Sequence, residues 1–249
     1  MINIEFNKHF KEFNEIKCRY RVAYGSAGSG KSVNIAQDYI MKLADTYYKG
    51  ANLLFLRKVD DTNRNSTFAE LCSAIYRIFP PDVVEKCWKI TTNPLMIENL
   101  QTGSQIIFRG MNDDKQREKV KSITFANGKL TWIWLEEATE FAESDIDILD
   151  DRLRGHLQNE HLYYQMTFSF NPVSASHWIK RKYFDYKDED IFTHHSTYLQ
   201  NRFIDEAYHK RMERRRRQDP EGYKVYGLTH SIGHKSLRDK AICKTYLNR

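Results

Sequence analysis

A glycine-rich stretch, YGSAGSGKSV at residues 24–33, holds the side chains best suited to chemistry. It fits the spacing GxxxxGK[ST], which is typical of loops that bind the phosphates of a nucleotide. Small residues let backbone N–H groups approach the phosphates, and the helix that follows adds free N–H groups of its own. We predict that ATP contacts the whole loop: Gly25, Ser26, Ala27, Gly28, Ser29, Gly30, Lys31 and Ser32.

The last two residues of the loop have separate predicted roles. The Lys31 ammonium would contact the β- and γ-phosphates during catalysis, and the Ser32 hydroxyl would bind Mg²⁺. Two adjacent acids, Glu136 and Glu137 in TWIWLEEA, supply the carboxylates that hydrolysis needs. We predict that Glu136 lies on the metal side, where Asp is more usual, and that Glu137 is catalytic. The alternative is a pair of solvated glutamates at a strand end.

A further polar pair closes the segment TFSFNP. Ser169 and Asn171 are candidates for a sensor of the γ-phosphate, because motor ATPases often place polar groups at the end of such a strand. A plain Asn–Pro turn is the alternative.

Strand-like and helix-like segments alternate along the chain, which favours an α/β fold: a three-layer P-loop NTPase with a mainly parallel sheet. The expected strands cover residues 18–24, 52–57, 129–138, 162–172 and 191–199, with a hairpin over 95–110 that turns at Thr102 and Gly103. The expected helices cover residues 32–44, 66–79, 145–157 and 204–218. Residues 227–249 show too little periodicity to assign.

The net charge of +6 is a feature of the C-terminal part. From His209 onward there are 12 Lys and Arg against 4 Asp and Glu, whereas residues 1–208 hold 27 against 29. The predicted basic helix carries Arg214, Arg215, Arg216 and Arg217, which are candidates for contacts with DNA phosphates; a solvated helix face is the alternative. A second basic stretch, residues 115–121, is expected in a loop.

Other features argue against several functional classes. No apolar run is long enough to cross a membrane. Cys18, Cys72, Cys87 and Cys243 lack a metal-ligand spacing and are expected to be reduced thiols. His194 and His195 would point to opposite faces of a strand, so we expect no zinc site. Trp132 and Trp134 are expected to pack in the core.

Several segments, in this order, resemble the ATPase half of the large terminase subunit of tailed bacteriophages. They are GSAGSGKS, LFLRKVDDTNRNSTFAEL, IIFRGMNDDKQREKVKSI, WIWLEEATEF, LDDRLRG, FSFNPVSASHWIKRKYF and THHSTYLQNRFID, and they span roughly residues 18–226. The P-loop alone is generic, but the ordered set is specific to that family.

The resemblance implies an ATP- and Mg²⁺-dependent motor that moves double-stranded DNA into procapsids in the host cytoplasm. It further implies a homo-oligomeric ring, the small terminase subunit and the portal protein as partners. Ser169 and Asn171 would belong to a coupling motif, and Arg57 would lie near the nucleotide or DNA. Arg152 and Arg154 would be candidates for an arginine that reaches a neighbouring subunit's ATP, with surface ion pairs as the alternative.

The chain departs from the family at two places. Ala27 stands where many members have a P-loop arginine, and residues 227–249, with Asp239 as their single acid, cannot build a nuclease site. We therefore expect an ATPase domain over residues 1–204 and a basic helical appendage over 205–249 that leads toward a missing nuclease. Two other functions remain open: a truncated module that binds nucleotide and DNA without turnover, and a DNA-dependent ATPase of the helicase or repair type.

Overall fold

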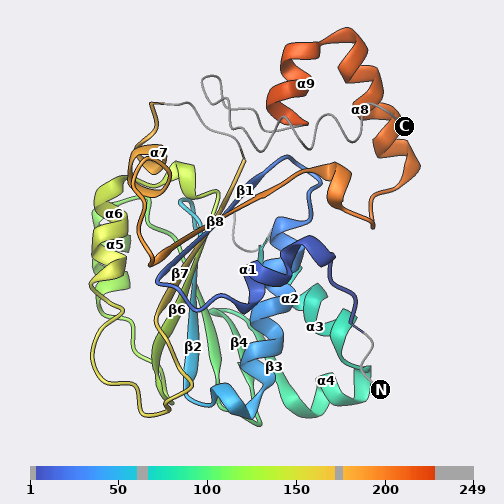
Figure 1. Ribbon diagram of the computed structural model, residues 1–249. Coiled ribbons are helices and arrows are strands. Elements are labelled where there is room, and N and C mark those ends of the chain that lie inside the picture. The colour runs from blue at the N-terminus through green and yellow to red at the C-terminus, as the bar shows by residue number, and fades with distance from the viewer. Residues whose placement is uncertain (1–3, 61–66, 172–175, 228–249) are drawn as a thin grey trace.

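A computed structural model describes residues 4–60, 67–171 and 176–227 (Figure 1). Within them, an eight-stranded sheet lies between two layers of helices, which confirms the predicted three-layer α/β fold. The strands are β1 (Tyr20–Gly25), β2 (Ala51–Leu56), β3 (Trp88–Thr92), β4 (Leu95–Asn99), β5 (Gln105–Arg109), β6 (Lys129–Glu136), β7 (Gln165–Phe170) and β8 (Ile191–Ser196).

The strand order is β3-β4-β5-β2-β6-β7-β1-β8. From β5 to β8 all neighbours run parallel, while β3 with β4 and β4 with β5 are antiparallel. The predicted hairpin is therefore confirmed as β4 and β5. The parallel part places the carboxyl ends of β6, β7 and β1 side by side at one edge, where polar residues that follow these strands can meet.

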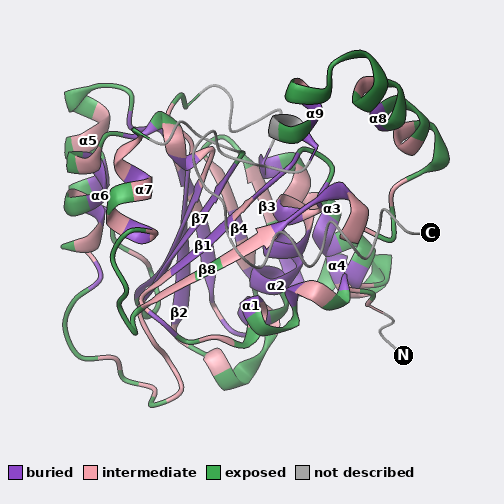
Figure 2. Ribbon diagram, turned by 45° about the horizontal axis from the view of Figure 1, so that its top comes forward, coloured by how far each residue is buried: buried purple, intermediate pink, exposed green. Residues whose placement is uncertain are grey.

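The helices are α1 (Lys11–Glu15), α2 (Lys31–Ala44), α3 (Ala69–Ile78), α4 (Pro81–Cys87), α5 (Asp114–Lys121), α6 (Glu143–Asp150), α7 (Trp178–Tyr183), α8 (Glu206–Gln218) and α9 (Pro220–Tyr226). Helices α1 to α4 cover one face of the sheet, and α5 to α7 cover the other (Figure 1). Figure 2 shows the central strands buried between the two layers, the edge strand β8 partly buried, and the outer helix faces exposed.

Successive side chains of β6 alternate between the two faces of the sheet, so this strand contributes to the core on both sides. Trp132 and Trp134, both fully buried, point toward α2, where Tyr39 packs against both rings. Ile133 and Leu135 belong to the core on the other face, because successive strand residues point to opposite sides. The prediction that the two tryptophans are core residues is confirmed.

Two element predictions were wrong. The basic stretch 115–121 is helical, because the Asp113 side chain accepts a hydrogen bond from the Gln116 N–H (2.8 Å) and caps α5. The helix expected over 145–157 ends at Asp150. There the Arg19 guanidinium donates hydrogen bonds to the carbonyl oxygens of Asp150 and Leu153 (both 3.0 Å), which the end of the helix leaves without a backbone donor.

The C-terminal part of the described chain forms a helical hairpin, α8 and α9, above the sheet (Figure 1). Tyr198, Met212 and Tyr223 form a small core of their own there, and the two tyrosine hydroxyls share a hydrogen bond of 2.9 Å. The helix predicted over 204–218 is confirmed as α8. The stretch 228–249, part of the tail left unassigned above, lies outside the described residues.

Cys18, Cys72 and Cys87 are free thiols, as expected, while Cys243 lies outside the described residues. Across the described ranges, every helix is too short or too polar to cross a bilayer.

Candidate nucleotide site

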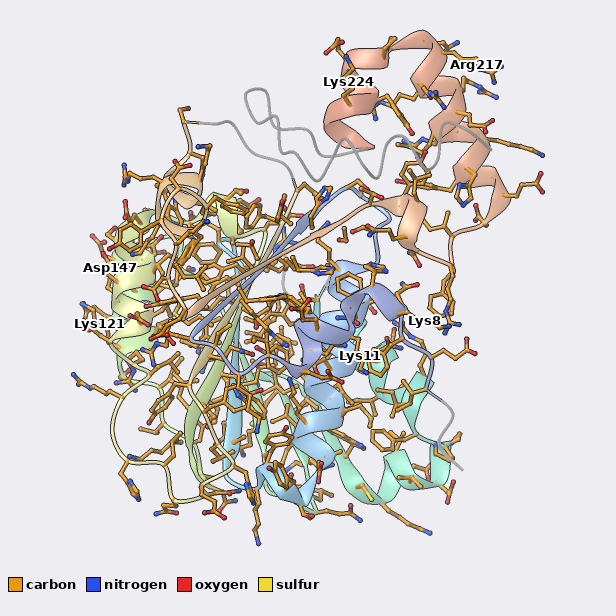
Figure 3. The ribbon with its side chains drawn as sticks, in the orientation of Figure 1. Lys8, Lys11, Lys121, Asp147, Arg217 and Lys224 are labelled. Carbon is orange, nitrogen blue, oxygen red and sulfur yellow. The ribbon has the colours of Figure 1, made fainter. Side chains whose placement is uncertain are left out.

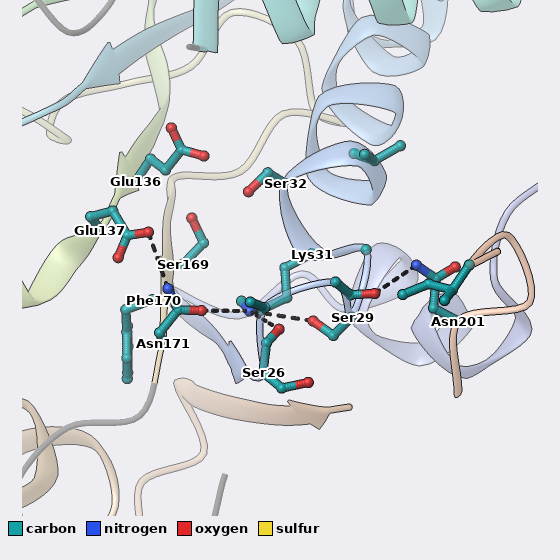
Figure 4. A pocket seen from close by; sticks show the side chains of 15 residues that line it. Ser26, Ser29, Lys31, Ser32, Glu136, Glu137, Ser169, Phe170, Asn171 and Asn201 are labelled. Carbon is teal, nitrogen blue, oxygen red and sulfur yellow. Dashed lines mark hydrogen bonds between the residues drawn. The ribbon is translucent and has the colours of Figure 1, made fainter. Parts of the chain in front are cut away.

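Three neighbouring strands bring the predicted site residues together. The glycine loop follows β1, the two glutamates end β6, and the polar pair ends β7, which lies between them. In the register of the sheet, Ser169 is paired with Ala23 on one side and with Glu136 on the other. The groups line one cavity of about 410 Å³ (Figure 4).

Glycine is required in the loop for two different reasons. A Cβ on Gly25 would lie 2.0 Å from the carbonyl oxygen of Ser196, so no side chain fits between β1 and β8. Gly30 has a φ of 86°, a left-handed conformation that turns the chain into α2 and that other residues rarely adopt. The loop is thus shaped so that the first N–H groups of α2 face the cavity.

Lys31 folds back over the loop. Its ammonium donates to the carbonyl oxygens of Gly25 (2.8 Å) and Ser26 (3.0 Å), and makes longer contacts with the Ser29 hydroxyl (3.3 Å) and the Asn171 amide oxygen (3.4 Å). Burial lowers the pKa of Lys31 to about 8, although the charges of Glu137 and Glu136 oppose this shift. A phosphate would be a better partner for this buried cation than neutral carbonyl groups.

Glu137 has an unusual backbone conformation. Its φ of 50° makes it the one residue other than glycine with a positive φ among those described. Such strain is uncommon and is concentrated at functional sites. Burial raises the pKa of this carboxyl group, Arg57 acts against the shift and Glu136 adds to it. A carboxylate of raised pKa at the mouth of a phosphate site is suited to accept a proton from water.

Asn171 connects the lysine with this glutamate. Its amide oxygen accepts from Lys31 (3.4 Å), and its amide nitrogen donates to Glu137 (3.4 Å), as Figure 4 shows. Ser169 also lines the cavity, but its hydroxyl is 2.9 Å from the indole nitrogen of Trp134, which donates to it. Of the two predicted sensor residues, Asn171 therefore contacts both Lys31 and Glu137, whereas the Ser169 hydroxyl contacts the core residue Trp134.

The oxygens around Glu136 are of the kind that Mg²⁺ prefers. Glu136, 13% exposed at its side chain, lies across the cavity from the Ser32 hydroxyl (Figure 4). A hydroxyl, one carboxylate and the phosphates of the substrate fit the way Mg²⁺ is usually held in nucleotide sites. The described residues contain no cluster of three or more His, Cys, Asp or Glu that would form an all-protein metal site.

A second cavity, of about 500 Å³, adjoins the first and shares Gly30, Val33 and Asn201 with it. Gln37, which is 9% exposed, lines this cavity, and its side-chain amide has no hydrogen-bond partner among the described residues. The Phe203 ring, 54% exposed, lines the same cavity. The second cavity thus offers a free amide and an aromatic face beside the glycine loop.

A profile of the family described as "Phage terminase large subunit" matches residues 17–230. The chain belongs to this family. It is 30% identical over 239 residues to the large terminase subunit of Bacillus phage SPP1, covering 92% of this chain and 54% of that protein. It is 28% identical over 247 residues to the PBSX phage terminase large subunit of Bacillus subtilis strain 168, covering 90% and 52%.

The terminase chain thus spans about half the length of the curated relatives it matches. Among solved structures, the large terminase of a thermophilic bacteriophage in complex with ADP superposes with a TM-score of 0.66 at 17% identity, covering 90% of this chain and 51% of that one. This likeness confirms the P-loop NTPase type of the α/β fold.

Two contacts on the P-loop of the terminase chain were not predicted. The Tyr208 hydroxyl donates to the carbonyl oxygen of Ala27 (2.8 Å), and the Asn201 amide donates to that of Gly28 (2.8 Å). Asn201 lies in the segment TYLQN, which is part of the family resemblance. Nothing in the sequence around Tyr208, which lies in a basic helix, indicated a contact with the loop. The Tyr208 contact joins α8 directly to the glycine loop, and the Asn201 contact joins the segment before α8 to it.

The arginines predicted to act elsewhere lie outside the cavity. Arg154 is exposed beyond α6, next to Tyr164 and thus near the amino ends of the strands, far from its own P-loop. On α8, Arg214, Arg216 and Arg217 are exposed, while Arg215 is half-buried and lies 4.0 Å from Asp219. Figure 3 shows Arg217 on the outer side of the hairpin, away from the sheet.

Proposed function

We propose that this terminase chain hydrolyses ATP with Mg²⁺ and uses the energy to move double-stranded DNA into a phage procapsid. The observation that carries the proposal is Asn171, which contacts both the phosphate-binding Lys31 and the catalytic candidate Glu137. A simple strand-end turn would not place one amide between these two groups. The arrangement can register whether a γ-phosphate is present and adjust the group that activates water.

The phosphates would occupy the cavity over residues 25–32, with Lys31 turned from the loop carbonyls to the β- and γ-phosphates. Ser32 and Glu136 would hold Mg²⁺, which when bound stabilises charge on the phosphates. The adenine would enter the second cavity, where Gln37 can pair with its edge and Phe203 can stack on its face. A large terminase with the same fold has been solved in complex with ADP, which supports a nucleotide at this position.

Hydrolysis then needs one proton acceptor. The oxygen of a water molecule forms a bond to the γ-phosphorus, the bond to the β–γ bridging oxygen breaks, and ADP leaves with that electron pair. Glu137 accepts the proton of the water, for which its raised pKa suits it. Asn171 and Ser169 would couple the loss of the γ-phosphate to movement of the surrounding elements.

The remaining roles concern DNA and assembly. Arg214, Arg215, Arg216 and Arg217 on α8 would contact DNA phosphates without sequence preference, as a motor for any DNA requires. Arg154 lies too far from its own site to act there, and we propose that it reaches the ATP of a neighbouring subunit in a ring. We further propose the portal protein and the small terminase subunit as partners, the host cytoplasm as the location, and residues 205–249 as an appendage to an ATPase domain over residues 1–204.

Steady-state ATP turnover of the purified chain, with and without duplex DNA, tests the proposal, with Glu137→Gln as the blank. We expect turnover above the blank that rises with duplex DNA. Nucleotide binding without turnover would identify a silent binding module, and stimulation by single-stranded DNA alone would indicate a helicase-type ATPase.

Replacing Gln37 by Leu tests the adenine position: the preference for ATP over GTP should fall about tenfold, and an unchanged preference would place the base elsewhere.

A further inference from the structure

Glu136 is held by two donors that come from the segment between β2 and α3. Arg57 Nη1 lies 3.3 Å from Glu136 Oε2, and the Thr67 hydroxyl donates to the same oxygen in a closer contact. Among the described residues nothing hydrogen-bonds Glu136 Oε1. One carboxylate oxygen is therefore anchored, and the other is left for the cavity.

Of these two donors, Thr67 has the better-defined position. It is 1% exposed, and the next residue, Phe68, packs edge-to-face against Phe108 with ring centroids 5.3 Å apart. Phe108 packs on Phe55, which packs on Trp134 of β6, the strand that carries Glu136. The aromatic rings thus fix the distance between Thr67 and the end of β6.

Arg57 is held less tightly. It reaches Glu136 through one nitrogen at 3.3 Å, and its buried Nε has no hydrogen-bond partner in the described part of the chain. Its positive charge also competes with a cation for the Glu136 carboxylate, whereas the neutral Thr67 hydroxyl orients the carboxylate without opposing a cation.

We propose that Thr67 is a positioning residue for the metal-side carboxylate: it holds Glu136 Oε2 so that Oε1 faces Mg²⁺. The inference rests on the proposed function, in which Glu136 holds the metal. The two residues are separated by 69 in the sequence, which explains why the pair could not be found from sequence spacing.

The test measures Mg²⁺ dependence by nucleotide binding rather than by activity. A fluorescent, slowly hydrolysed ATP analogue is titrated against the full chain over a range of free Mg²⁺ and also in EDTA. Mg²⁺ should increase the affinity for the analogue, and the midpoint is the free Mg²⁺ concentration that gives half of this increase. For Thr67→Val we expect the Mg²⁺ midpoint to rise about tenfold, as for the loss of a partner that orients a metal ligand. Thr67→Ser keeps the hydroxyl and should stay within about twofold of the wild type.

Thr102→Val is the matched control, because it removes another buried threonine hydroxyl, one that donates to the Leu43 carbonyl (2.7 Å) far from the site. It should leave the Mg²⁺ midpoint unchanged, and all three variants should bind the analogue in EDTA as the wild type does. An unchanged midpoint in Thr67→Val, or an equal shift in Thr102→Val, would overturn the inference. Absence of any Mg²⁺ effect in the wild-type chain would instead overturn the metal site of the proposed function.

Discussion

The nucleotide site and the arginine helix α8 hold their charges in opposite ways. In the site, Lys31 contacts four acceptors and Glu136 contacts two donors. On α8, Arg214, Arg216 and Arg217 form no ion pair within the described residues. Yet the two regions touch, through the hydrogen bond from Tyr208 to Ala27.

The difference fits what the proposed function would require of each region. Phosphoryl transfer depends on groups held in fixed positions, and hydrogen bonds to neighbouring atoms provide that order in advance. Contact with any DNA sequence needs positive charge that is not already neutralised by the protein and that can adapt to the backbone. The basic residues of α7 make the contrast clear, because Arg181 and Lys182 pair with Glu143 (2.5 Å) and Asp147 (2.9 Å).

The largest expected effect is on turnover. Glu137→Gln removes the proton acceptor and should lower the ATP turnover rate about 1,000-fold while nucleotide affinity stays near that of the wild type. Glu140→Gln is the matched control, since this exposed glutamate lies three residues further on and outside the cavity. Equal turnover of both variants would show that Glu137 is not catalytic.

A second effect concerns pH. Lys31 has a pKa lowered to about 8 and binds phosphate only when protonated, so nucleotide affinity should fall as the pH rises through that value. Between pH 7 and pH 9 the expected loss is about tenfold. Binding titrations of wild type and Lys31→Met check this, because the variant should be weak throughout and without this decline. A flat profile in the wild type would contradict the assignment.

The contrast between paired and unpaired arginines predicts a third effect. Replacing Arg214 and Arg217 by Ala should weaken duplex DNA binding about tenfold and reduce the slope of log affinity against log salt by about 2. Replacing Arg181 and Lys182 by Ala removes the same charge from α7, where it is already paired, and should change affinity less than about twofold. Equal losses in the two double variants would mean that net charge alone governs binding.

The smallest expected effect is on stability. Tyr208→Phe removes the hydrogen bond to the Ala27 carbonyl, and the free energy of unfolding should fall by about 1 kcal/mol. Tyr186→Phe alters a hydroxyl on a residue that is 68% exposed and should have no measurable effect. Denaturant unfolding of both variants checks this, and equal stability would show that the P-loop is not held by α8.

The parts of the fold that could be predicted are those with a local signal. The ends of β1, β6 and β7 were correct to within a few residues because hydrophobic runs stop there at glycine, glutamate or Ser–Phe–Asn. Strand β3 and helix α4 were missed because they are five and seven residues long and too short to show a period. Strands β4 and β5 are equally short, but the turn at Thr102 and Gly103 between them indicated a hairpin. Helix α5 was missed because residues 115–121 were judged by their positive charge and not by the capping residue Asp113 that precedes them.

By itself, the sequence determined which residues are suited to chemistry: the glycines of a tight loop, the lysine and serine after them, and the polar residues that end two strands. Tertiary structure alone decided which distant residues lie against them. Thr67 on Glu136, Gln37 in the second cavity and Tyr208 on the loop depend on how the layers pack. Local propensity acts over a few residues, whereas these contacts join segments that only packing against a common sheet brings together.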